Sequence, residues 1–77
     1  MPDGAYHHGD LRNALIKAAL DLLNESGPEG VSLRAVARRA GVSHAAPYHH
    51  FVDKAALMDA VALTGFKMLR DAIMSAH

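Results

Sequence analysis

Ser32 and Ser43 both occupy positions suited to a helix N-cap, and Gly41 lies two residues before the second serine. Serine is a preferred N-cap because its hydroxyl accepts a hydrogen bond from a backbone N–H of the first turn. Gly41 ends the first segment and is expected to adopt the positive φ that the turn demands. The spacing predicts a helix from Ser32 to Gly41, a three-residue turn, and a further helix over residues 44–51 that crosses the first steeply.

Small and apolar side chains around this turn suit two helices in close contact. Ala37 must be small because the following helix crosses over it, and Val42 fills the gap between the two helices. The inward face of the first segment comprises Leu33, Val36, Ala37 and Ala40. Such a turn holds the following helix away from the body of the domain, where it can enter the major groove of DNA.

A longer helical pattern precedes this unit. Asp10 occupies an N-cap position, and apolar residues then repeat at helical spacing up to Gly27 and Pro28, which predict the end of this first helix. Residues 1–9 contain two glycines and a proline without apolar periodicity, and they are expected to form a flexible N-terminal arm.

A second long pattern follows the unit, beginning at Asp53 and Lys54. Its apolar stripe contains Leu57, Val61, Thr64 and Met68, with Met58, Leu69 and Ile73 beside it. Gly65 interrupts the stripe and costs about 1 kcal/mol relative to alanine, so the helix bends there or one element ends and another begins. We therefore predict an all-α fold: a three-helix bundle with a helix-turn-helix formed by helices 2 and 3 (residues 10–53), plus a longer fourth helix (residues 54–77).

Charge is distributed unevenly along the chain. The formal net charge is zero, which argues weakly against a nucleic-acid partner. Residues 30–52, however, contain three arginines and three histidines and no acidic residue, so the middle of the chain is locally basic. Arg38 and Arg39 in this stretch are either solvated charges or phosphate contacts.

Composition argues against catalysis, metal binding and membrane insertion. The chain has no cysteine, no apolar run of about 20 residues, and no glycine-rich phosphate loop. Its acids are scattered over expected caps and solvent faces, so we expect no catalytic residues and no enzyme. The adjacent pairs His7-His8 and His49-His50 would point about 100° apart on a helix, so no metal site and no cofactor is expected.

The segment from Gly41 to Phe51, followed by Asp53-Lys54-Ala55-Ala56-Leu57, resembles the signature of the TetR family of transcriptional regulators. The resemblance covers about residues 10–65. Most family members carry threonine and leucine where this chain has Ala46 and Pro47. With Ser43 as N-cap, Pro47 falls at about the fourth helical position, where its missing N–H deletes the first intrahelical hydrogen bond. The opening turn is then distorted or begins one residue later.

The resemblance implies DNA-binding roles for individual residues. Ser32 and Ser43, as caps, leave backbone N–H groups facing phosphates, Lys54 contacts phosphate at the start of helix 4, and Arg34 reaches a guanine. Tyr48 suits a phosphate or a thymine methyl contact. His44 and Ala45 are expected to contact bases directly, and His49 and His50 to contact phosphates.

By the same resemblance, the full protein is expected to be a cytoplasmic homodimer that binds a palindromic operator in double-stranded DNA. A small-molecule effector would act through a C-terminal ligand-binding and dimerisation domain that is missing from these 77 residues, and would release the DNA. The alternative from the residues alone is a helical protein–protein interaction module without DNA binding, for which the apolar stripe after residue 54 would supply the partner surface.

Overall fold

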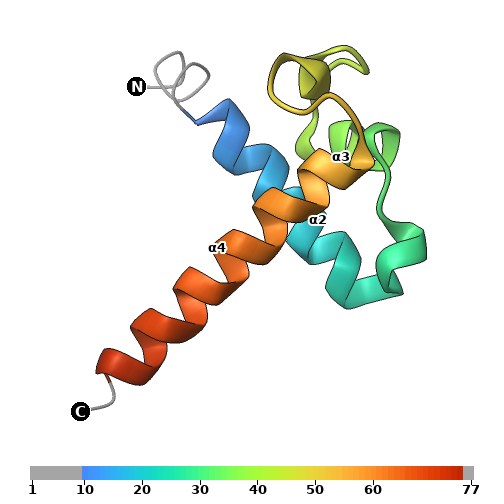
Figure 1. The fold of residues 1–77 in the computed structure, drawn as a ribbon. Coiled ribbons are helices and arrows are strands. Elements are labelled where there is room, and N and C mark those ends of the chain that lie inside the picture. Colours follow the sequence, from blue (N-terminus) through green and yellow to red (C-terminus); the bar gives the residue numbers. More distant parts are fainter. Residues whose placement is uncertain (1–9, 76–77) are drawn as a thin grey trace.

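The computed structural model describes residues 10–75, and all regular structure within them is helical (Figure 1). The expected all-α class is confirmed. Three α-helices and two short 3-10 segments follow one another: α2 (Leu11–Ser26), η2 (Pro28–Gly30), α3 (Leu33–Ala40), η3 (Ala46–His49) and α4 (Lys54–Ser75). The expected flexible arm, residues 1–9, lies outside the described residues.

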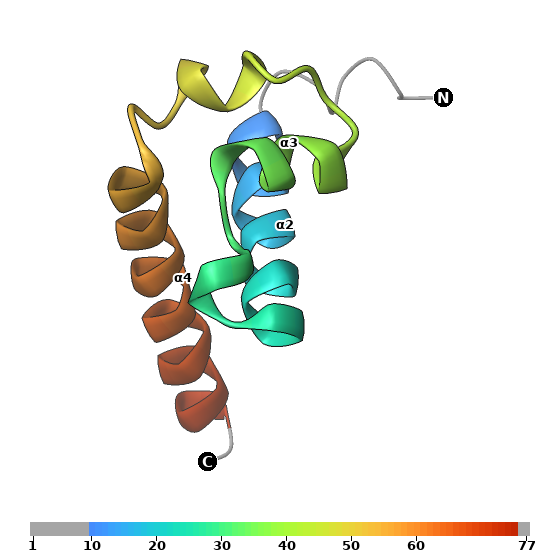
Figure 2. The ribbon, with the colours of Figure 1, turned by 90° about the vertical axis from the view of Figure 1, so that its right-hand side faces the viewer.

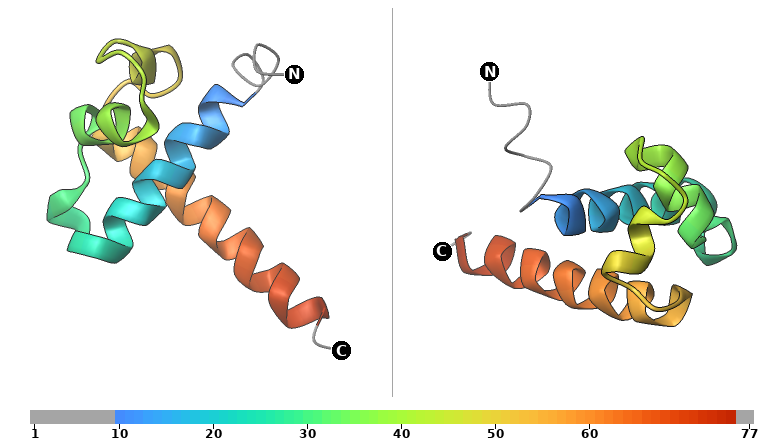
Figure 3. Two further views of the ribbon diagram at one scale, coloured as in Figure 1. Left: turned by 180° about the vertical axis from the view of Figure 1, so that it is seen from behind. Right: turned by 90° about the horizontal axis from the view of Figure 1, so that it is seen from above.

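The core lies where α2 packs against α3 on one side and α4 on the other (Figure 3). Leu15, Val36 and Leu57, one from each α-helix, are fully buried. Their neighbours in the core are Ile16, Ala18, Ala19, Val31, Leu33, Ala37, Phe51 and Val61. Burial of the larger side chains among them, leucine, isoleucine, valine and phenylalanine, stabilises a domain by about 1.5–3 kcal/mol each. The inward face expected for α3 is confirmed at Leu33, Val36 and Ala37.

Helix ends in the first half of the chain follow the sequence signals. α2 ends at Ser26, and the N–H of Gly27 donates to the carbonyl of Leu23 at 2.9 Å. The Ser32 hydroxyl accepts a hydrogen bond from the N–H of Ala35 at 3.0 Å, which confirms it as the cap of α3. Asp10 precedes α2 as expected, but its side chain makes no capping hydrogen bond.

Gly41 ends α3 in the left-handed conformation, with φ of 76° and ψ of 31°. The next N–H, that of Val42, donates to the carbonyl of Ala37 at 3.0 Å and closes the turn. Because residues with a Cβ rarely adopt this conformation, glycine here directs the chain away from the axis of α3. The predicted break between the two segments is confirmed.

The prediction of an α-helix over residues 44–51 is wrong, because only the 3-10 segment η3 forms there. Most of its bonds link residues three apart: the carbonyls of Ser43, Ala45 and Pro47 accept from residues 46, 48 and 50 at 3.0–3.1 Å. The Pro47 carbonyl also accepts from the N–H of Phe51, four residues on, at 2.9 Å. Pro47 has no N–H to donate to the carbonyl of Ser43, which accepts from Ala46 instead. Regular structure therefore begins at Ala46, and Ser43 is not the N-cap that the sequence suggested.

α4 runs without interruption through Gly65, so no element ends there. The carboxylate of Asp53 caps it by accepting from the N–H of Ala56 at 2.9 Å. Its first half buries Leu57 and Val61 against the core, whereas its second half projects past the other helices (Figure 2). Large apolar side chains on this projecting half, both in the predicted stripe and outside it, are 55–71% exposed: Leu63, Phe66, Met68, Leu69, Ile73 and Met74.

Candidate nucleic-acid interface

Every residue singled out as a DNA contact is exposed in the structure: Ser32, Arg34, Ser43, His44, Ala45, Tyr48, His49, His50 and Lys54. The side chains of Pro47 and Phe51 point the other way and are buried. These two residues hold the stretch over residues 43–50, called here the 43–50 segment, against the domain. The segment therefore presents its polar side chains to the solvent, while the buried Pro47 and Phe51 anchor its backbone to the core.

Four of these residues line one shallow hollow. Ser32 and Arg34 come from the start of α3, Tyr48 from η3, and Lys54 from the start of α4. Leu33, Val52 and Asp53 complete the lining. Asp53 is the acidic member, and its carboxylate accepts the capping hydrogen bond of α4. The hollow thus brings two cations and two hydroxyls together from elements up to 22 residues apart in the sequence.

Lys54 makes a contact that the sequence did not predict. Its Nζ donates to the backbone carbonyl of Pro28 at 2.8 Å and so joins the start of α4 to η2. An ammonium carries three N–H donors, so this bond leaves two that can meet an anion. Lys54 is thereby fixed beside the hollow by one bond while it keeps its capacity for a phosphate.

The two hydroxyls of the hollow have different surroundings. Ser32 uses an oxygen lone pair for the cap of α3, and its hydroxyl proton can still be donated to an anion. Tyr48 is 60% exposed, so both its ring and its hydroxyl are open to solvent. Each can serve as a donor to a phosphate oxygen.

The remaining predicted residues lie outside this hollow. Ser43, His44 and Ala45 are in the turn that precedes η3, and His49 and His50 are at the end of η3. Because η3 and not Ser43 begins the regular structure, the cap argument for Ser43 no longer applies. His44 and Ala45 precede the regular element instead of forming its first turn.

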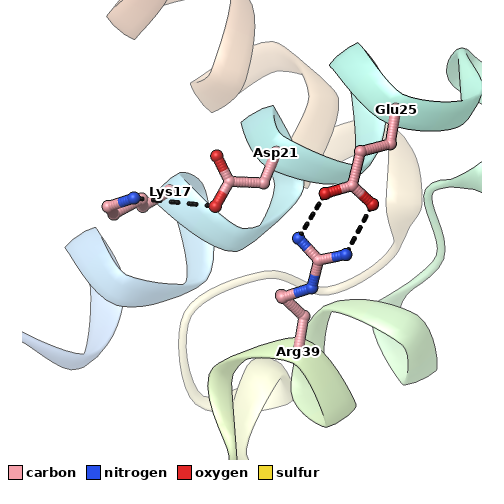
Figure 4. A network of polar contacts seen from close by, with 4 residues as sticks. All are labelled: Lys17, Asp21, Glu25 and Arg39. Atoms are coloured by element: carbon pink, nitrogen blue, oxygen red, sulfur yellow. Dashed lines mark hydrogen bonds and ion pairs between the residues drawn. The ribbon is translucent and has the colours of Figure 1, made fainter.

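The sequence left two alternatives for Arg39, a solvated charge or a phosphate contact. The structure shows a third, an ion pair within the protein. The Arg39 guanidinium makes two hydrogen bonds to the Glu25 carboxylate, at 2.6 and 2.9 Å, and joins the end of α3 to the end of α2 (Figure 4). These hydrogen bonds, helped by the positive charge, hold the pKa of Glu25 below its ordinary value. On α2 nearby, Lys17 and Asp21 pair at 3.6 Å. No sequence signal identified the Arg39 pair, because its partners are 14 residues apart and on different helices.

Within residues 10–75, no three histidine or acidic side chains are grouped so that they could hold a metal ion. In the same part of the chain, no helix combines the length and the apolar character needed to cross a membrane.

An α-helix ended by a left-handed glycine, a tight turn and an outward-facing polar segment is the geometry of a helix-turn-helix protein. The sequence family described as "Bacterial regulatory proteins, tetR family" matches residues 15–61, which is more than half of the chain. The chain belongs to the tetR family, whose members are transcriptional regulators and not enzymes.

Individual relatives support the same assignment. The tetracycline repressor protein class A from transposon 1721 of Escherichia coli is 54% identical over 50 residues, which are 65% of this chain and 23% of the relative. The class C repressor of Escherichia coli is 51% identical over 51 residues, 66% and 23% of the two chains. The HTH-type transcriptional regulator BetI of Klebsiella pneumoniae is 41% identical over 64 residues, 83% and 33%. The match thus spans a third or less of each relative, and no solved structure matches significantly.

Proposed function

We propose that this chain binds double-stranded DNA sequence-specifically, as the DNA-binding module of a ligand-released repressor. The observation that carries the proposal is the exposed polar surface formed by the start of α3, the 43–50 segment and the start of α4. It includes the hollow with Arg34 and Lys54, and no acidic residue lies between residues 30 and 52. A polyanion is the partner that such a surface fits.

Contacts to phosphate and contacts to bases are divided among the elements in this proposal. Lys54, Ser32 and Tyr48 hold the backbone, because donors from three elements meet at the hollow. Arg34 extends from α3 toward a guanine, which its guanidinium can bind through two hydrogen bonds. From the 43–50 segment, His44 and Ala45 approach base edges, while Ser43, His49 and His50 contact the backbone.

The proposal extends to the architecture of a longer protein, since each relative continues well beyond its matched part. Residues 10–53 form the DNA-binding domain, and residues 54–77 lead into a domain that binds a small-molecule effector and pairs two protomers. Two copies set about 34 Å apart would meet successive major grooves of a palindromic operator. Binding of the effector would change that separation and release the DNA.

Selection of duplexes from a random pool tests this function. The chain is fused to a parallel dimerising helix pair, and bound duplexes are enriched over several rounds. A palindromic consensus with a fixed half-site spacing is the expected result. As a control, a variant carrying both Arg34→Ala and Lys54→Ala should enrich no sequence. A wild-type fusion that folds but enriches none would refute sequence-specific binding.

A second candidate function rests on the projecting half of α4, where Phe66 is 71% exposed and Met74 68% exposed. Exposed apolar patches of this kind mark protein-binding surfaces. A protein–protein interaction module would use this apolar surface of α4 and leave the 43–50 segment without a ligand. Replacing Phe66 and Leu69 with serine would then abolish partner binding, whereas the DNA-binding proposal predicts that duplex affinity per module is unchanged.

A further inference from the structure

Arg12 and Phe51 join the start of α2 to the end of the 43–50 segment. The guanidinium carbon of Arg12 lies 5.6 Å from the centroid of the Phe51 ring, within the range of a cation–π contact. Phe51 follows the segment directly and is only 3% exposed, so its ring is a fixed support. Arg12, in contrast, is exposed. The contact therefore holds a solvent-facing cation in place.

The charge of Arg12 is not neutralised by this contact. Within residues 10–75, the ion pairs of the structure involve Lys17, Arg39 and Arg70, and no carboxylate of that range lies within 4.0 Å of the Arg12 guanidinium. An aromatic face attracts a cation. Unlike a carboxylate, however, it does not take up the five N–H donors of a guanidinium. The Arg12 group keeps both its charge and its donors for an anion in the solvent.

The position of Arg12 places these donors beside the DNA-facing surface. The ring of Phe51 also lies 6.3 Å from that of His50, so Arg12 and His50 both lie near one buried phenylalanine. Figures 1 and 2 agree that the N-terminal end of α2 and η3 share one end of the molecule, whereas α4 ends at the other. Arg12 thus adds a cation from α2 to a surface otherwise built from α3, η3 and α4.

We infer that Arg12 is a further DNA-contacting residue, which binds a backbone phosphate while Phe51 holds its guanidinium in position. The inference rests on the proposed function and extends the surface to a helix outside the helix-turn-helix. The competing explanation is that the Arg12 side chain only covers the Phe51 ring. A covering role needs the aliphatic stem, whereas a phosphate contact needs the charge, so the two can be separated.

Arg12→Met separates them, because methionine keeps an unbranched apolar stem and a similar helix propensity but removes the charge. Arg70→Met is the matched control: it makes the same change on α4, where Arg70 is 70% exposed at the opposite end of the molecule. Affinity of the 77-residue chain for a short mixed-sequence duplex is measured by fluorescence anisotropy at several salt concentrations. Each phosphate contact adds about 0.9 to the slope of log affinity against log salt.

Arg12→Met should lower this slope by about 0.9, so that its affinity deficit is about 3.5-fold larger at about 50 mM than at about 200 mM salt. Arg70→Met should leave the slope unchanged. Equal slopes for wild type and both variants would overturn the role of Arg12 and leave the proposed function intact. A wild-type chain that is folded and binds no duplex would refute the proposed function, and the inference with it.

A measurement on the wild-type chain covers the case in which Arg12→Met does not fold. The Nε–H resonance of Arg12 is followed by NMR as the duplex is added, with that of Arg70 as the internal reference. We expect the Arg12 signal to shift and the Arg70 signal to stay in place. An Arg12 signal that stays in place while amide signals of the 43–50 segment shift would overturn the assignment.

Discussion

Replacing Gly65 with alanine should stabilise the protein. Gly65 lies in the interior of α4, and a Cβ added there would meet no atom within 4 Å outside its own helix and chain neighbours. The substitution therefore costs nothing in steric overlap, while alanine gains about 1 kcal/mol over glycine at a helix interior position. For a domain of this size, that gain corresponds to a rise in melting temperature of about 4–8 °C.

Gly41→Ala provides a control with the opposite sign. An added Cβ at Gly41 also meets no atom within 4 Å, but the backbone there has a φ of 76°. An L-residue in the left-handed region costs about 1–2 kcal/mol, so the melting temperature should fall. The two glycines have equally open surroundings, and only their backbone conformations differ. The pair therefore isolates the effect of φ from that of packing.

Thermal unfolding followed by far-UV circular dichroism measures both variants, and urea titration at fixed temperature gives the free energy of unfolding. If Gly65→Ala left the midpoint unchanged or lowered it, α4 would not be a continuous helix through residue 65 in solution. If Gly41→Ala were neutral, the left-handed turn between α3 and the 43–50 segment would be refuted.

Four other perturbations have defined outcomes. Ser32→Ala removes the hydroxyl that caps α3 and should cost about 1 kcal/mol in urea unfolding, whereas Ser32→Asp, which restores a cap, should recover most of it. Because Arg39 lowers the pKa of folded Glu25, the pair stabilises the protein above the ordinary value of 4.5 and this contribution is lost as pH falls through the lower, folded value. Wild type should therefore melt above Glu25→Gln at neutral pH and converge with it in acid, and a constant difference would contradict the ion pair. Lys54→Ala should weaken binding to all duplexes alike and reduce the salt slope by about 0.9, and an unaltered slope would remove its phosphate contact. Arg34→Ala should lose about 1–3 kcal/mol at a single base position of the selected operator, whereas a uniform loss over all base variants would make it a backbone contact.

Local signals predicted the first half of the fold well. The end of α2 before Gly27, the cap at Ser32 and the left-handed turn at Gly41 each depend on one residue and its near neighbours. Such features are encoded over a few positions, so a single sequence is enough to identify them. The failure at residues 44–51 is also local: Pro47 has no N–H for the first hydrogen bond of an α-helix capped by Ser43.

Contacts between distant residues were not predictable in the same way. Arg39 with Glu25, Lys54 with the Pro28 carbonyl, and Arg12 with Phe51 join residues that are 14, 26 and 39 positions apart. The packing of α2 against α3 and α4, and of η3 against α3, brings them together. The sequence therefore indicated which side chains carry charge, but not that Arg39 forms an ion pair with Glu25 within the protein.

Likewise, Val31 lies between two helical segments and belongs to no apolar period, yet it is 1% exposed. The 3-10 turn η2 directs it into the core after Gly30, and no periodic pattern could have indicated this burial. For the candidate interface, all nine predicted residues are exposed, and their contact with DNA stays a prediction. Which of these residues line the hollow and which lie outside it depends on how the elements are arranged, and the sequence alone did not indicate this.

The short length of η3 limits how far this regular element can extend along a double helix. Its four residues rise about 2.0 Å each, or about 8 Å in all, whereas an α-helix over residues 44–51 would have risen about 12 Å. Successive base pairs are about 3.4 Å apart, so η3 placed lengthwise in a groove spans little more than two base-pair steps. Any longer footprint on a half-site has to be completed by side chains from the neighbouring turn and from α2, α3 and α4.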